Sequence, residues 1–243
     1  MKLKILGSSS RGNCYVLENQ NSALIIECGV RFLDVKKALN YDISKIVGCI
    51  ISHSHGDHCG YIQQYINAGI NVFLSEETNK ELPSSNFLNK VIYKTQELFE
   101  IGFFSVLPFE LLHDVKCHGF LIDHPETGTF CFITDTHYSP FRFADLNNIM
   151  IECNYSKELL DAHCAKLHPM VMQRTIKSHI SLDTCKEFLK ANDLTKVNNI
   201  ILLHLSDGNS DEQLFINEIK KLTGKNIHAA KAGIEIDFNK NPF

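Results

Sequence analysis

The stretch Ser52-His53-Ser54-His55-Gly56-Asp57-His58 places three imidazoles and one carboxylate in a single short segment. The run just before it, residues 46–51, is short, apolar and rich in β-branched side chains, which is typical of a buried strand. The segment therefore opens a loop at the carboxyl end of a strand. Neutral imidazole nitrogen and carboxylate oxygen both bind Zn²⁺ at roughly 2.0–2.2 Å, so this density of ligands indicates a metal site.

The spacing within the loop indicates two metal ions. Side chains alternate along an extended segment, so His53 and His55 can face one ion. Asp57 and His58 then turn towards a second ion, and we expect Gly56 to permit the bend between the pairs. A catalytic zinc usually has about three protein ligands and an open position for water, so two ions need more ligands than this loop supplies.

Further ligands are found after later apolar runs. Each run is a predicted strand, and a metal-binding side chain stands at its carboxyl end. These side chains are His113 after residues 106–112, Asp135 after residues 130–134 and His204 after residues 200–203. The sequence therefore supplies seven candidate ligands from four places.

This order of ligands and strands resembles the metallo-β-lactamase superfamily, whose H-x-H-x-D-H signature is matched at every defining position. The resemblance implies an α/β (α+β) fold, a four-layer αβ/βα sandwich of two mixed β-sheets with outer helices. It also implies a ligand set: His53, His55 and His113 for one metal, Asp57, His58 and His204 for the other, and Asp135 as the bridge.

Shorter segments are similar to the YycJ-like (WalJ-like) branch of that superfamily. They are residues 7–13, 134–136, 151–154, 178–181 and 203–206. Two positions depart from the usual pattern. Glu27 stands before Cys28-Gly29 where relatives commonly carry Asp, a position that braces the metal loops, and Tyr155 stands where relatives often have His.

Composition fits one compact enzyme. The chain has 243 residues, 44% of them hydrophobic, and no linker separates the candidate ligands, so we expect residues 1–243 to form a single domain. No apolar run approaches the roughly 20 residues of a membrane span. Residues 1–6 are too short for the apolar part of a signal peptide and are predicted to be a strand.

The cysteines indicate a reducing compartment. There are nine, an odd number, scattered through predicted strands and helices, which predicts free thiols in a cytoplasmic protein. Cys28, Cys49, Cys131 and Cys153 are expected to be small buried apolar side chains. Cys59 adjoins the metal loop, and we expect the histidines to fill the site without it.

The remaining elements follow from hydrophobic patterns and end signals. Helices are predicted over residues 31–39, 59–68, 156–165, 169–177, 182–191 and 211–222, with N-caps at Ser181 and Ser210 and helix stops at Gly69 and Gly224. Strands are predicted near residues 2–6, 14–18, 23–27, 46–52, 71–74, 102–107, 118–123, 129–134, 148–152, 199–204, 226–229 and 233–237. Gln213 is expected to complete a capping box with Ser210.

The predicted ligands suit phosphodiester hydrolysis. Two divalent ions about 3.5–4 Å apart can hold a hydroxide between them and stabilise the attacking and leaving oxygens. Asp57 can accept the proton of the water. The resemblance to ribonuclease Z relatives implies that His179 donates a proton to the leaving oxygen and that Glu152 orients it. Without that resemblance, Glu152 is a strand-end acid and His179 a neighbour of a capped helix.

The leading hypothesis is a dinuclear phosphodiesterase that acts on nucleic acid, with DNA favoured over RNA, as an exonuclease of the YycJ-like kind. Zinc is the first candidate metal and manganese the second. The interval between Asp135 and His204 is too short for the insertion of the β-CASP nucleases. Residues 166–177 are modestly basic. This segment is equally consistent with a solvated helix face and with a surface that contacts phosphate.

Two other functions stay open. The same metal pair could hydrolyse a small ester, lactone, thioester or cyclic nucleotide. The absence of a basic rim around the cleft would favour this function. The chain could also be a non-catalytic DNA-associated module with a vestigial metal site. We expect no membrane partner, and the net charge of −4 means that any nucleic-acid surface is local.

Overall fold

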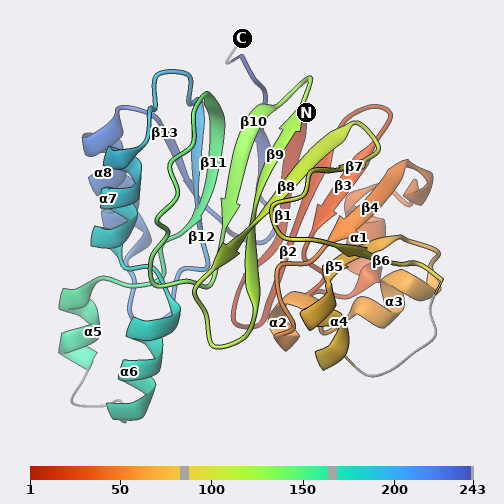
Figure 1. Ribbon diagram of the computed structural model, residues 1–243. Helices are drawn as coiled ribbons and strands as arrows, with labels where there is room; N and C mark the ends of the chain where they lie inside the picture. The colour runs from red at the N-terminus through yellow and green to blue at the C-terminus, as the bar shows by residue number, and fades with distance from the viewer. Residues whose placement is uncertain (83–87, 164–168, 242–243) are drawn as a thin grey trace.

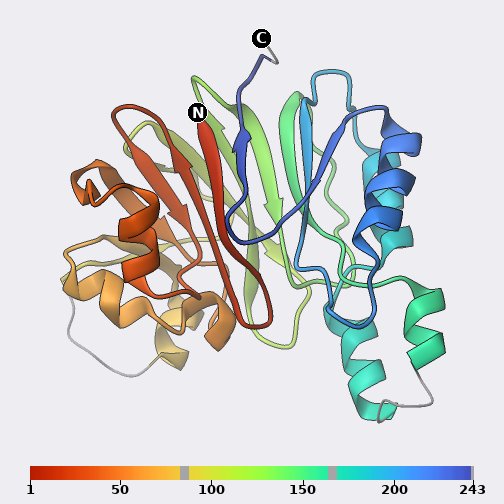
Figure 2. The same cartoon turned by 180° about the vertical axis from the view of Figure 1, so that it is seen from behind.

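The computed structural model describes residues 1–82, 88–163 and 169–241. Two seven-stranded sheets pack face to face, and helices lie on their outer faces (Figure 1, Figure 2). The first sheet has the order β14 (Glu235–Asp237), β1 (Lys2–Ser9), β2 (Gly12–Glu18), β3 (Ala23–Ile26), β4 (Ile46–Ile50), β5 (Val72–Ser75) and β6 (Lys90–Tyr93). The second has the order β13 (Asn226–Ala229), β12 (Asn199–Leu203), β11 (Leu146–Glu152), β10 (Gly128–Ile133), β9 (Cys117–His124), β8 (Phe104–Leu111) and β7 (Phe99–Ile101). The predicted αβ/βα sandwich is confirmed.

Helices cover both outer faces. On the first sheet lie α1 (Phe32–Ala38), α2 (Gly56–Cys59), α3 (Ile62–Asn67) and α4 (Glu76–Glu81), and a 3-10 turn spans Ile43–Lys45. On the second lie α7 (Leu182–Ala191) and α8 (Glu212–Thr223), while α5 (Lys157–His163) and α6 (Pro169–Ser178) extend from its end (Figure 1). The outer faces of the sheets are thereby removed from water.

Three apolar clusters hold these layers together. The one between the sheets draws fully buried side chains from both, such as Leu3 and Phe132. A second joins the outer face of the first sheet to α1 and α3 through Phe32 and Tyr65. A third joins the second sheet to α7 and α8, where Phe215 is fully buried. Burial on both faces explains why β10, β11 and β12 read as continuous apolar runs.

Parallel strands bring the candidate residues to one end of the sandwich. β3 and β4 are parallel in the first sheet, and β10, β11 and β12 are parallel in the second. β8 has the same direction as β10, because each is antiparallel to β9. The carboxyl ends of all these strands therefore meet at the end where α2 and α6 lie (Figure 1).

Some local predictions are wrong. The helix predicted over residues 59–68 is divided into α2 and α3, because the Tyr61 amide donates to the Cys28 carbonyl across the fold. α8 is capped by Asp211, which accepts a hydrogen bond from the Leu214 amide. Ser210 donates its hydroxyl to the Ser206 carbonyl, so it forms no capping box.

Other elements were not predicted. α4, β6 and β7 are short and polar or lie at a sheet edge. The strand predicted over residues 102–107 corresponds to β8, which begins at Phe104 after a turn at Gly102. The N-cap at Ser181 is confirmed by a hydrogen bond from the Thr184 amide, and Gly224 is left-handed as expected. The carboxyl end of the helix predicted over residues 156–165 lies partly outside the described residues.

Candidate metal centre

The loop after β4 changes from extended chain to helix within the candidate motif. His55 is extended, with φ −62° and ψ 146°, and α2 begins at Gly56. Asp57 and His58 therefore lie in the first turn of a helix, while His53 lies in the loop before it. The change from extended chain to helix separates the two pairs. Gly56 begins the helix without a left-handed backbone, so the expectation that the special freedom of glycine permits this bend is wrong.

One group consists of His53, His55 and His113, whose ligand-capable ring atoms lie within 4.8 Å of one another. His55 Nδ1 and His113 Nε2 are 3.2 Å apart. His53 Nε2 is buried without a hydrogen-bond partner among the described residues, whereas its Nδ1 lies 2.8 Å from Ser52 Oγ, to which it donates in the tautomer that leaves a lone pair on Nε2. A buried ring nitrogen without a partner is costly in water-free surroundings, and a metal ion would satisfy it.

Burial also sets the protonation of this group. It lowers the pKa of His53 well below the ordinary value, and it lowers the pKa of His113 as well. Both rings are therefore neutral at physiological pH and keep a lone pair for a cation. The donors and their protonation fit a divalent metal ion.

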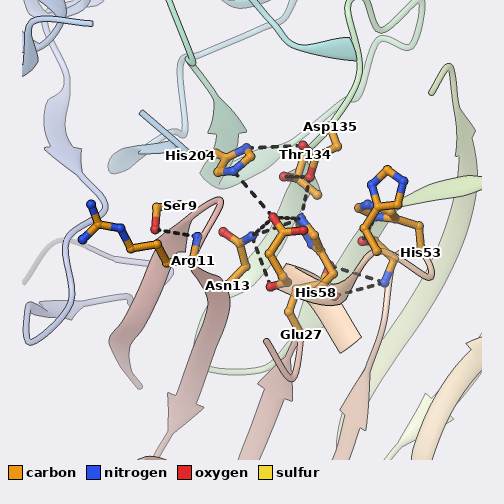
Figure 3. A network of polar contacts seen from close by, with 12 residues as sticks. Ser9, Arg11, Asn13, Glu27, His53, His58, Thr134, Asp135 and His204 are labelled. Carbon is orange, nitrogen blue, oxygen red and sulfur yellow. Dashed lines mark hydrogen bonds and ion pairs between the residues drawn. The ribbon is translucent and has the colours of Figure 1, made fainter. Parts of the chain in front are cut away.

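Asp135 connects the remaining side chains. Its Oδ2 lies 2.7 Å from His58 Nε2, while its Oδ1 lies 3.3 Å from His204 Nδ1 and 3.2 Å from His179 Nδ1. Thr134 Oγ1 donates to Oδ2 at 3.0 Å. Although burial acts in the opposite direction, the charges of His58 and His204 hold the pKa of Asp135 well below its ordinary value. Asp135 is therefore an anion that contacts His58 and His204, as Figure 3 shows, and its ligand atom also lies within 4.8 Å of His53 in the first group.

Asp57 lies between the two remaining candidate histidines. Its Oδ2 is 3.3 Å from His58 Nε2 and 3.8 Å from His204 Nε2. Asn13 Nδ2 donates to the same oxygen at 3.1 Å. The structure thus brings together Asp57, His58 and His204, the three side chains predicted to share one metal.

Glu27 supports His58 from below the centre (Figure 3). Its side chain is fully buried, and Oε1 lies 3.4 Å from His58 Nδ1. Both carboxylate oxygens also lie 3.3 Å from the Ser52 amide, at the start of the histidine loop. Glu27 therefore contacts both the loop and the second histidine pair, as its position before Cys28-Gly29 predicts.

Glu152 and His179 form a second pair beside Asp135. Glu152 Oε1 lies 2.7 Å from His179 Nδ1 and 3.0 Å from His204 Nδ1, and Oε2 accepts from the Ile180 amide at 3.1 Å. Despite burial, Glu152 and Asp135 raise the pKa of His179 to about 10, and the same carboxylates raise that of His204 to about 9. The ligand-capable atoms of this pair, Asp135 and His204 also lie within 4.8 Å of one another.

Three residues of the centre have left-handed backbones. Glu27, Asp135 and His204 have φ of 67°, 47° and 53°, and each stands within two residues of the end of a strand. Such conformations cost about 1–3 kcal/mol for residues with side chains. They turn the chain sharply at the strand end and aim each side chain into the space between the sheets' edges.

Asn13 and Asp114 were not predicted to belong to the site. Asp114 Oδ1 lies 3.1 Å from His113 Nε2, and Arg174 Nη2 lies 3.8 Å from Asp114 Oδ2. Asp114 follows His113 directly, which is the one sequence signal that could have found it. His137, two residues after Asp135, is exposed and does not line the cavity of the centre.

The other histidines and Cys59 have ordinary partners. Cys59 Sγ donates to the carbonyl oxygens of Ser54 and His55, at 3.0 and 3.3 Å. His118 and His124 are buried, with partners at Thr95 Oγ1 and the Glu126 amide. His168 and part of the basic segment 166–177 lie outside the described residues. Among residues 1–82, 88–163 and 169–241, no helix is long and apolar enough to cross a membrane.

The centre opens into a cavity of about 240 Å³. Its walls include Ser10 and Arg174 together with six of the side chains above, His55, Asp57, His113, Asp135, His179 and His204. The side chain of Arg174 is 72% exposed, and it stands at the opening. A small anionic group can therefore reach the centre past a guanidinium.

Known proteins are similar to this chain in sequence or in architecture. Exodeoxyribonuclease WalJ of Streptococcus pneumoniae is 24% identical over 254 aligned residues, which cover 98% of this chain and 92% of WalJ. The metallo-beta-lactamase fold protein YhfI of Bacillus subtilis superposes with a TM-score of 0.72 at 16% identity, and the superposition covers 97% of this chain and 98% of YhfI. Human tRNase Z, short form, superposes with a TM-score of 0.65 at 14% identity and the same coverage of each chain.

The family itself is shown by sequence. The profile of the metallo-β-lactamase superfamily matches residues 9–166, which include the histidine loop, His113 and Asp135. The predicted resemblance is confirmed, and so is the likeness to the WalJ-like branch at low identity. With its histidines and aspartates arranged for metal binding, this chain belongs to the metallo-β-lactamase superfamily and is a metal-dependent hydrolase.

Proposed function

We propose that the protein is a dinuclear metal-dependent phosphodiesterase, and that its substrate is DNA, which it degrades as an exonuclease. The observation that carries the proposal is the position of Asp135, whose carboxylate lies within 4.8 Å of His53 in the first group of imidazoles and contacts His58 and His204 in the second. The name of the WalJ relative supports nucleic acid as substrate and DNA over RNA. We further propose that residues 1–243 form one domain, and that it is cytoplasmic, since the eight described cysteines are free and buried.

The metals are assigned to seven side chains. His53, His55 and His113 would hold the first ion. Asp57, His58 and His204 would hold the second, and Asp135 would serve both. Zinc is favoured by the excess of imidazole ligands, and manganese is the alternative. When bound, the two ions supply Lewis-acid activation of water and of the phosphoryl oxygens.

The protein's own groups then move protons. The carboxylate of Asp57 has a second oxygen free to accept a proton from the attacking water. His179 is held at Nδ1 by Glu152, at 2.7 Å, so its Nε2 is the ring atom that can protonate the leaving oxygen. Glu152 fixes this tautomer and, with Asp135, keeps the ring charged and ready to donate.

Arg174 is proposed to position the phosphate. It lines the opening of the cavity, and its neighbour Asp114 leaves most of the guanidinium exposed to an incoming anion. A guanidinium can bind phosphate through two parallel hydrogen bonds. Arg174 therefore recognises the charge that distinguishes a phosphodiester from a neutral ester.

A second candidate is hydrolysis of a small ester, lactone, thioester or cyclic nucleotide. The observation that favours it is the mixed charge around the cavity. Arg174 is paired with Asp114, and Arg11, on the β1–β2 turn, is paired with Asp207 at 3.1 Å. The described rim of the cavity is thus not uniformly basic. A surface that binds a long nucleic acid needs positive charge along its whole length.

A screen of purified, metal-supplemented protein separates these candidates. End-labelled DNA, RNA, bis-p-nitrophenyl phosphate and small carboxylic esters are offered side by side, with the Asp135→Ala variant as the control for contaminating nucleases. Stepwise shortening of DNA that the variant lacks supports the proposal. Ester hydrolysis without any phosphodiesterase activity contradicts it and favours the second candidate.

A further inference from the structure

A second cavity adjoins the metal cavity, and His179 is part of the wall of both. It has a volume of about 370 Å³, and it also shares Ser10, Thr175 and His204 with the first. The metal cavity of about 240 Å³ is smaller than the roughly 300–1,000 Å³ of ordinary ligand pockets. A phosphodiester with two organic substituents must therefore extend beyond it.

Away from His179 and His204, which it shares with the metal cavity, the second cavity is lined mainly by short polar side chains. Ser9, Asn154 and Asn209 contribute hydroxyl and amide groups, and Gly208 leaves space. The one carboxylate, Asp207, is paired with Arg11 across the loop at 3.1 Å. Hydroxyls, amides and carbonyls can hydrogen-bond to a sugar or a base, but they offer no net positive charge to a further phosphate.

The orientation of His179 decides which substituent lies here. Its Nδ1 is occupied by Glu152, which leaves Nε2 for the leaving oxygen. The group attached to that oxygen must lie beside His179, and the adjoining cavity is the space that His179 borders. The metal cavity then keeps the phosphoryl group.

We propose that the second cavity is a leaving-group subsite, and that it takes the nucleoside whose oxygen is released at His179. This inference rests on the proposed phosphodiesterase function and adds to it the place and chemistry of one substituent. The nucleoside is held by hydrogen bonds to its sugar and base, and it contributes binding energy that favours cleavage of a nucleotide ester over a simple alkyl ester.

Gly208 offers a way to fill this subsite alone. It lines the second cavity and not the metal cavity. A Cβ added there would lie 3.9 Å from the His163 ring, which is ordinary contact, and the backbone is not left-handed. Leucine can therefore add bulk at the edge of the cavity without straining the chain. Ala232 is a matched control, since it lines a neighbouring depression of about 320 Å³ that does not include His179.

The experiment compares two substrates with the same phosphoryl group in metal-loaded protein. One is thymidylyl-thymidine, and the other is the methyl ester of thymidylate, so both release an alkoxide but only the first fills the subsite. Gly208→Leu should lower kcat/KM for the dinucleotide by roughly 10-fold or more and leave the methyl ester nearly unchanged. Gly208→Ala should cause a smaller loss, and Ala232→Leu should affect neither substrate.

Binding gives a readout that does not depend on turnover. Titration of the metal-free protein with thymidine should shift the amide resonances of Gly208 and Asn209, and Gly208→Leu should abolish the shifts. Equal effects of Gly208→Leu on both substrates, or no effect with unchanged thymidine binding, overturn the subsite while leaving the phosphodiesterase in place. A wild-type protein that cleaves neither diester contradicts the proposed function and the subsite with it.

Discussion

Asp135 Oδ2 lies 2.7 Å from His58 Nε2 in the interior of the protein, where both side chains are almost fully buried. Two opposite charges at this distance stabilise each other strongly when little water separates them. In the absence of metal they are each other's counterion. Binding of a metal ion to the centre must displace the proton from His58. A proton and a metal ion therefore compete for the same two atoms, His58 Nε2 and Asp135 Oδ2.

We predict that the protein binds two metal ions per protomer. Seven candidate ligands converge on the centre, and the unpartnered Nε2 of His53 identifies a position that a cation would satisfy. Elemental analysis of reconstituted, gel-filtered protein should approach a ratio of two. A ratio that stays at one after saturation contradicts the dinuclear assignment.

Loss of Asp135 should damage metal pairing more than loss of a terminal histidine. A bridging carboxylate neutralises both cations and fixes their separation, whereas His113 serves one ion. Anomalous scattering from crystals of Asp135→Ala and of His113→Ala compares the occupancy of both sites. Two fully occupied, normally spaced ions in Asp135→Ala would refute the bridging role.

His179→Ala should keep both metals yet lose roughly 10²- to 10⁴-fold in rate, the usual contribution of a positioned general acid. Glu152→Gln should show a smaller loss in the same direction, because it removes the partner of His179 Nδ1 but leaves the ring. The defect should shrink with a p-nitrophenolate ester, whose departure needs little protonation. Metal loss in His179→Ala would instead make His179 a ligand, and equal defects for both leaving groups would remove it from acid catalysis.

Arg174→Ala should raise KM for a phosphodiester by roughly 5-fold, since the guanidinium is exposed and its contacts are weakened by solvent. It should leave the metal content unchanged. Arg31→Ala is the matched control, because Arg31 forms an equally exposed pair with Asp34 on α1. Steady-state kinetics on bis-p-nitrophenyl phosphate measures both, and equal KM values for Arg174→Ala and wild type would exclude a phosphate contact.

His118 should make the fold less stable at mildly acidic pH. Burial lowers its pKa in the folded state, so below the ordinary value of about 6.5 the unfolded chain binds a proton that the folded chain does not. Stability is therefore lost as the pH falls. Urea unfolding of metal-free protein measures the free energy of unfolding at about pH 7.5 and about pH 5.5. Between these pH values, that free energy should fall less in His118→Gln than in wild type. The exposed His137→Gln is the control, and an identical drop in all three proteins would reject the effect.

The parts of the site that the sequence predicts are those set by local order. His53, His55, Asp57 and His58 stand together in the chain, so their convergence needs only one loop. Asp135 and His204 could be placed because each ends a strongly apolar strand. Their partners in space could not be predicted. The Asn13–Asp57 contact joins the start of β2 to α2, and no periodicity in the sequence indicates it.

The wrong predictions have the same origin. The pattern of residues 59–68 is helical throughout, and the break at Tyr61 is imposed by its hydrogen bond to Cys28 in another element. α4 carries the opposite problem, since it is almost entirely polar. It is stabilised by the Ser75 cap and by the Glu76–Lys80 pair rather than by an apolar face, so hydrophobic periodicity could not detect it.

The left-handed backbones of Glu27, Asp135 and His204 have a consequence for protein engineering. Glycine adopts this backbone conformation without the steric cost that other residues bear. At Asp135, however, glycine would leave the buried His58 without its counterion, and breaking a buried ion pair costs more than the backbone strain that glycine relieves. A library of variants sorted only for survival at high temperature should therefore retain Asp135, so selection for heat resistance would preserve this residue of the centre.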